Sequence, residues 1–129
     1  VRYSTSGNKS IRLIVTDANA CRDTGSLSIH VRPNPTASFT LNNTTQCLSG
    51  NAFATTNNSS GATSYIWNFG DGTTSTATAP SKSYTTSGSY TIRLIAISAN
   101  GCRDTQSASV TVYPQPTAAF TVNNASQCL

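Results

Sequence analysis

The chain has 129 residues, a length that allows one domain or slightly more. Only 9% of the residues are charged, glutamate and methionine are absent, and serine, threonine and asparagine together number 52. The net charge of +4 comes from basic residues scattered along the chain, which argues against a nucleic-acid-binding protein. No apolar stretch approaches the roughly 18 residues of a transmembrane helix, so no membrane span is expected.

The beginning of the chain recurs near its end. Residues 1–48 match residues 82–129 at a constant offset of 81, with 28 identities in 48 aligned pairs. A period of this length suits a small sandwich domain and is too long for a solenoid repeat. We therefore expect 1–33 to be the C-terminal strands of a preceding repeat, 34–114 a complete repeat and 115–129 the first strand of a following one. Because the chain starts within a strand pattern, we expect it to be cut from a longer protein.

Proline pairs mark the two expected joints between repeats. Pro33 and Pro35 follow the first alternating strand pattern, and Pro114 and Pro116 occupy the equivalent positions of the next repeat. Proline favours extended backbone and restricts rotation, so these joints are predicted to be short and semi-rigid.

Several short segments of the central repeat have the apolar alternation of β-strands, and strong helix formers are scarce. We expect strands at 36–41, 51–56, 63–69 and 89–98, and a last strand carrying Ala108, Val110 and Val112. This spacing predicts an all-β sandwich. The side chains that alternation places on the buried face are Tyr65, Trp67, Phe69, Tyr90, Ile92 and Leu94.

Glycine and aspartate mark the turns between these strands. Gly70, Asp71 and Gly72 predict a tight turn, since glycine allows positive φ and aspartate caps its own backbone. Gly88 is expected to turn the chain into the 89–98 strand. The Asn100-Gly101 pair predicts a hairpin between the last two strands.

The segment Tyr65-Ile66-Trp67-Asn68-Phe69-Gly70-Asp71-Gly72, with the later Gly88-Ser89-Tyr90 and Ile92-Arg93-Leu94, resembles the polycystic-kidney-disease (PKD) domain. The resemblance covers the whole central repeat and implies an immunoglobulin-like β-sandwich without catalytic residues. The Asn-Gly-Cys-Arg-Asp-Thr segment that begins at Asn100 looks like repeats found in large secreted or surface proteins of Bacteroidota-type bacteria. Asn68 stands where the family often has aspartate, which weakens any inference of cation binding.

Three residues are candidates for a specific role in metal binding, sugar binding or catalysis. Asp71 is a weak calcium candidate, because calcium prefers several oxygen ligands and the repeat supplies only Asp71 and Asp104 as carboxylates. Trp67 could stack on a sugar, but its alternation favours the core. His30 has no evident nucleophile beside it and is interpreted as a surface residue. We therefore expect no catalytic residue, no metal site and no cofactor.

The disulfide candidates are Cys21, Cys47, Cys102 and Cys128. In the immunoglobulin-like topology that the resemblance implies, Cys47 and Cys102 lie at opposite ends of one sandwich. Those ends are separated by about 20 Å, whereas a disulfide requires Cα atoms within about 7 Å. A bridge from Cys47 to the Cys102 equivalent of the next repeat is therefore preferred; a Cys47–Cys102 bridge and free thiols stay open as alternatives.

The leading functional hypothesis is a non-enzymatic, semi-rigid spacer in an extracellular bacterial stalk, fibre or adhesin. Its expected partners are the neighbouring repeats of the same chain, with other copies in a fibre or cell-surface glycans as further possibilities. The alternative is a carbohydrate- or protein-binding accessory module of a secreted hydrolase. An exposed aromatic patch would favour this second interpretation.

Overall fold

A computed structural model describes residues 2–122 of the chain. Within this range all regular secondary structure is β-strand, as the composition predicts, and no helix is long and apolar enough to cross a membrane. The strands, in chain order, are β1 (Gly7–Thr16), β2 (Arg22–Val31), β3 (Phe39–Leu41), β4 (Thr45–Cys47), β5 (Phe53–Asn57), β6 (Ser64–Asn68), β7 (Thr74–Ser75), β8 (Ser81–Lys82), β9 (Gly88–Ile97) and β10 (Arg103–Tyr113).

Strands β3 to β10 form a two-layered sandwich. One sheet has the strand order β4-β10-β9-β6-β7, and the other has the order β3-β5-β8. The pairs are antiparallel except for β4, which runs parallel to the end of β10. The predicted immunoglobulin-like sandwich is confirmed.

The core lies between the two sheets and is centred on Trp67. Trp67, Ile92 and Leu94 are fully buried, which removes a large apolar area from water. The ring of Phe39, from the opposite sheet, packs edge-on against the indole at a centroid distance of 5.1 Å. The indole N–H donates a hydrogen bond to the backbone oxygen of Ala77 at 2.9 Å. The one tryptophan therefore joins both sheets and the loop after β7.

The six residues expected in the core do not all reach it equally. Phe69 is buried like Trp67, Ile92 and Leu94, whereas Tyr65 and Tyr90 are only partly buried and pack against the edge of the core. Each of the two tyrosines carries a hydroxyl group that favours contact with water or a polar partner. The core is completed by Ala37, Phe39, Phe53, Tyr84, Ala96, Val110 and Val112.

The first expected strand, at 36–41, is shortened to β3, and the segment that follows it forms β4 in the other sheet. β3 begins at Phe39 and pairs with β5, and the chain then crosses so that β4 pairs with β10. Residues before β3 are held by other means: Thr36 forms a bridge with Ser60, and the backbone N–H of Ala37 donates to the Asp104 carboxylate at 2.8 Å. The start of the sandwich is thus fastened to β10 by a side chain rather than by a backbone ladder.

Two strand ends differ from expectation. Gly88 does not lie in the preceding turn; it is the first residue of β9 and pairs with Val112. The Asn100-Gly101 hairpin is present, but its turn runs from Ser98 to Cys102, with the Ser98 N–H donating to the Cys102 oxygen at 2.9 Å. Gly101 has a φ of 79°, which glycine adopts without strain.

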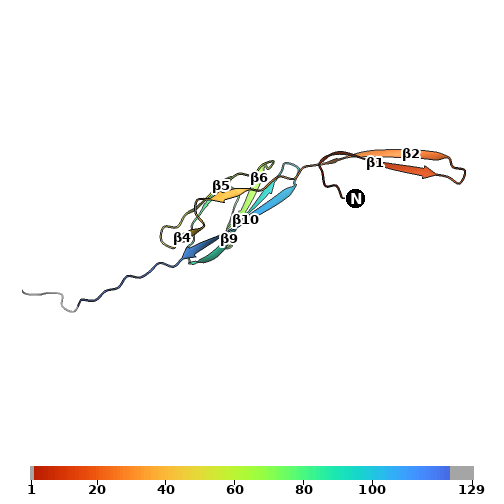
Figure 1. Cartoon of the computed structure of the whole chain (residues 1–129). Helices are drawn as coiled ribbons and strands as arrows, with labels where there is room; N and C mark the ends of the chain where they lie inside the picture. Colours follow the sequence, from red (N-terminus) through yellow and green to blue (C-terminus); the bar gives the residue numbers. More distant parts are fainter. Residues whose placement is uncertain (1, 123–129) are drawn as a thin grey trace, which may run out of the picture.

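Strands β1 and β2 form a separate antiparallel hairpin before the sandwich. Figure 1 shows this hairpin extending from one end of the sandwich, while the segment after β10 leaves from the opposite end. Only residues 32–35 separate the end of β2 from the Thr36 bridge. The described part of the chain is therefore elongated, with its two units arranged one after the other.

Candidate functional site

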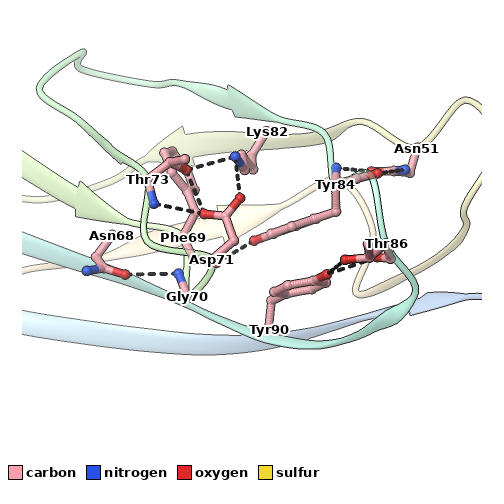
Figure 2. Close-up of polar contacts among 10 residues, drawn as sticks. All are labelled: Asn51, Asn68, Phe69, Gly70, Asp71, Thr73, Lys82, Tyr84, Thr86 and Tyr90. Atoms are coloured by element: carbon pink, nitrogen blue, oxygen red, sulfur yellow. Dashed lines mark hydrogen bonds and ion pairs between the residues drawn. The ribbon is translucent and has the colours of Figure 1, made fainter.

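The turn after β6 is closed by its own side chains (Figure 2). The Asn68 side-chain oxygen accepts the Gly70 N–H at 2.9 Å. Asp71 Oδ1 accepts both the N–H and the hydroxyl of Thr73, at 3.0 and 2.6 Å. A Cβ on Gly70 would lie 2.9 Å from the backbone N and O of Thr91, so this position has no room for a side chain. The turn therefore rests directly on the backbone of β9.

Lys82, from β8, neutralises the carboxylate of this turn. Its ammonium lies 2.6 Å from Asp71 Oδ2 and donates to the Thr73 hydroxyl at 2.8 Å. The same ammonium is 5.5 and 5.4 Å from the ring centroids of Phe69 and Tyr84, within cation–π range. Desolvation alone would raise the pKa of Asp71, but the hydrogen bonds from Lys82 and Thr73 outweigh it and lower that pKa to about 2.

This arrangement bears on the weak calcium candidate. Asp71 already has a cationic partner in Lys82, and a calcium ion would have to displace that ammonium. Among residues 2–122, no group of three or more His, Cys, Asp or Glu side chains comes together to hold a metal. Asp104, the other carboxylate of the repeat, accepts the N–H groups of Ala37 and Thr105, and these hydrogen bonds lower its pKa. The two carboxylates thus serve different parts of the fold.

Tyr84 connects the turn after β6 to the segment before β5 (Figure 2). Its hydroxyl donates to the Phe69 backbone oxygen at 2.8 Å, and its backbone exchanges two hydrogen bonds with the Asn51 amide at 2.7 and 2.8 Å. Its ring stacks on that of Tyr90 at 3.8 Å, with an angle of 12° between the planes. Burial, together with Asp71 and Tyr90, raises the pKa of the Tyr84 hydroxyl. Each contact supports the fold.

Trp67 lies in the core, and His30 lies on the surface of the hairpin. Trp67 is fully buried and presents no face on which a sugar could stack. His30 lies exposed on β2, where one ring nitrogen is 2.6 Å from the side-chain oxygen of Asn8 on the paired strand.

The joint between the hairpin and the sandwich is fixed by polar and steric contacts. The guanidinium of Arg32 donates to the side-chain oxygen of Asn100 in the β9–β10 turn. Pro35 is buried, and its Cα would lie 3.5 Å from a Cβ built on Gly61. Pro33, in contrast, is exposed. Pro114 and Pro116, the equivalent pair, are exposed beyond β10.

The cysteines lie at the ends of the two units. Cys21 is exposed in the β1–β2 turn, and Cys102 is half-buried at the equivalent point between β9 and β10. Cys47 is exposed in β4, where it is the register partner of Tyr113. Because Cys47 pairs with Tyr113 and Cys102 immediately precedes Arg103, the two cysteines are about 36 Å apart along β10, too far for the alternative Cys47–Cys102 bridge. Cys128 lies outside the described residues.

Two residues that hold the Asp71 turn and Tyr84 in place, Lys82 and Asn51, were not identified from the sequence. Lys82 lies in a polar stretch without alternation, and Asn51 was taken only as the start of a strand. No local pattern links Asn51 to Tyr84, 33 positions further on, or Lys82 to Asp71. Their partners become clear only when the two sheets are packed.

The fold and its motifs have counterparts among known proteins. The family model for the PKD domain matches residues 30–112, more than half of the chain. The chain belongs to the PKD domain family, as the resemblance of the Trp67 strand and the glycine turn suggests. The PKD domain is a non-catalytic module.

Two curated relatives match part of the chain. The collagenase ColA of Bacillus cereus is 43% identical over 53 residues, which is 41% of this chain and 6% of the collagenase. The pre-pro-metalloprotease PrtV of Vibrio cholerae is 45% identical over 49 residues, or 38% of this chain and 5% of that protein. The chain thus spans only a small fraction of the length of the curated relatives it matches.

Solved structures show the same sandwich. The PKD1 domain of the Vibrio cholerae metalloprotease PrtV is 35% identical with a TM-score of 0.56, and the match covers 63% of this chain and 99% of that domain. The PKD1 domain of Vibrio anguillarum Epp is 31% identical with a TM-score of 0.56, covering 64% of this chain and 98% of that domain. Nearly the whole of each domain corresponds to one part of this chain.

Proposed function

We propose that this chain is a segment of a longer extracellular protein in which 81-residue PKD repeats are joined in series as a semi-rigid spacer. The observation that carries the proposal is the pairing of the hairpin. In β1–β2, Gly7 pairs with Val31 and Thr16 with Arg22; in β9–β10, Gly88 pairs with Val112 and Ile97 with Arg103. The two hairpins therefore have one register, shifted by the 81-residue period. This shared register supports the expected division into 1–33, 34–114 and 115–129.

The hairpin also exposes the face that its counterpart buries. Ile11 and Leu13 are 45% and 65% exposed, whereas the equivalent Ile92 and Leu94 are fully buried. Exposed apolar faces of this kind are costly in water and normally mark a surface that another element covers. The opposite sheet of a preceding sandwich would cover this face, as the β3-β5-β8 sheet covers the buried face of β9 that carries Ile92.

The joint supports stiffness rather than free rotation. Four residues connect the two units, two of them are prolines, and Arg32 is tied to the turn of the next unit. A flexible connection would instead be rich in glycine and serine and free of contacts. We place the protein outside the cell, since a cysteine-containing, serine- and threonine-rich β-sandwich suits an oxidising compartment.

The test uses a protein in which residues 34–81 are placed directly before Val1 of the full chain. Position 1 corresponds to position 82, so this addition supplies the missing part of the first repeat without a break in the period. We expect small-angle scattering to give the length of two sandwiches in series, and amide exchange to show protection of Ile11 and Leu13. A compact side-by-side particle, or an unprotected hairpin, would contradict the spacer.

The second candidate is an accessory module of a secreted hydrolase, as the collagenase and metalloprotease relatives suggest. In that role the repeat would bind a protein or polysaccharide substrate, or a cell-surface glycan, for a catalytic domain elsewhere in the same protein. Sedimentation of the extended protein with fibrillar collagen and with insoluble polysaccharides tests it. Binding that saturates would favour the accessory module; its absence in all cases would favour the spacer.

A further inference from the structure

Each sandwich carries one cysteine at either end. In the central unit, Cys47 is aligned with Tyr113, the last residue of β10. Cys102 immediately precedes Arg103, the first residue of the same strand. The strand thus separates the two thiols and directs one to the joint that follows the unit and the other to the joint that precedes it.

The 81-residue period shows which cysteine meets which at a joint. Arg32 corresponds to Tyr113, so a preceding unit of the same kind would place its Cys47 equivalent beside Arg32, about 5 Å away across a parallel strand pair. The Arg32 side chain contacts Asn100, and Cys102 follows Asn100 by two residues. The Cys47 equivalent of one unit and the Cys102 of the next therefore face the same joint.

The geometry points to a disulfide across each joint, linking the Cys47 position of one repeat to the Cys102 position of the repeat that follows. This inference rests on the proposed series of repeats. Cys47 is exposed and Cys102 half-buried, so both sulfurs are accessible for the exchange. Oxidised glutathione can supply the oxidising equivalents: the S–S bond forms from two thiols, and their two protons and two electrons convert one glutathione disulfide to two glutathione thiols.

The bridge would act on the joint rather than on either sandwich. The Arg32–Asn100 contact fixes the angle between units by one exposed hydrogen bond, which is weak on its own. A covalent link on the same side would hold that contact closed. The four-residue connection and the disulfide would then be two separate covalent links between the units, which together would prevent the units from bending apart.

The experiment uses the extended protein described above, with residues 34–81 placed before Val1, and with the original Cys47 and Cys128 changed to serine. After folding in a glutathione redox buffer, we expect non-reducing peptide mapping to show the added copy of Cys47 joined to Cys102, with Cys21 still reactive toward a thiol reagent. Cys102→Ser should abolish the linked peptide, and the matched Cys21→Ser variant should leave it unchanged.

The possible results separate this inference from the function on which it rests. If Ile11 and Leu13 are protected from exchange but Cys102 stays reduced or pairs with Cys21, the disulfide is wrong and the series of repeats stands. If Ile11 and Leu13 stay unprotected, the first repeat has not formed, and the proposed function fails together with the bridge.

Discussion

Of the glycines in the chain, Gly70 has the least room for a side chain. Its φ of 78° is a region that L-residues rarely adopt, and a Cβ would be 2.9 Å from the backbone of Thr91. Gly72 has a φ of 86° but open space around it. A side chain at position 72 would therefore meet only an unfavourable φ, whereas a side chain at position 70 would meet both an unfavourable φ and a steric clash.

We expect Gly72→Ala to lower the free energy of unfolding by about 1 kcal/mol, the cost of positive φ alone. Gly70→Ala should cost about 3 kcal/mol or more, because β9 must also move away. Urea unfolding followed by Trp67 fluorescence measures both. Equal losses in the two variants would show that the contact with Thr91 is relaxed at little cost.

The pair of Asp71 and Lys82 predicts a dependence of stability on acid. The pKa of Asp71 is about 2 in the folded chain against an ordinary 3.8, so its contribution is complete above about pH 4 and is lost as the pH falls toward 2. Asp71→Asn should therefore be less stable than the parent by about 1–2 kcal/mol at pH 7, and most of this difference should be lost as the pH falls through about 2. Unfolding curves at several pH values measure it.

Lys82→Met is the control for this prediction. It removes the ammonium and keeps the apolar contact with the rings of Phe69 and Tyr84, so the pKa of Asp71 should return toward its ordinary value. The acid dependence should shrink accordingly. A difference between parent and Asp71→Asn that is constant with pH would mean that the asparagine alters packing instead of charge.

At the scale of single strands, β9 and β1 offer a matched comparison. Ile92 is fully buried between the sheets, whereas Ile11, its equivalent, is 45% exposed on the hairpin. Ile92→Ala should destabilise the sandwich by about 3 kcal/mol, and Ile11→Ala in the same chain by less than about 0.5 kcal/mol. Urea unfolding of the two variants measures both changes in the free energy of unfolding. A large loss of stability in Ile11→Ala would show that the apolar face of the hairpin is already covered.

The strands that sequence could predict are those with apolar alternation. Trp67 and Phe69, and likewise Ile92 and Leu94, repeat at period two, and their strands are present close to the expected bounds. β4 was not anticipated, because Thr45, Gln46 and Cys47 show no alternation. An edge strand in which no side chain is fully buried leaves no hydrophobic signal, and its position is set by the partner strand. The contacts of Lys82 and Asn51 could not be predicted either, because they depend on tertiary packing and leave no local sequence pattern.

At the scale of the whole molecule, the joint is the feature that decides shape. In the extended protein with two complete units, Arg32→Ala should leave the stability of each sandwich within about 0.5 kcal/mol, because no core contact is lost. It should broaden the distribution of angles between the units, as measured by residual dipolar couplings under reducing conditions. Arg93→Ala, an exposed arginine on β9, is the control. Unchanged couplings in Arg32→Ala would assign the stiffness to the prolines alone.

The parallel pairing of β4 with the end of β10 has a mechanical consequence. A pull applied along the long axis reaches the sandwich through Thr36 at one end and Tyr113 at the other. The Thr111 N–H to Thr44 oxygen and Leu48 N–H to Tyr113 oxygen bonds, at 2.8 and 2.9 Å, lie across that line of force. They are loaded in shear and must rupture together, whereas an antiparallel hairpin pulled from its open end would unzip bond by bond. A unit built this way therefore resists stretching along its long axis better than a hairpin pulled open from its end.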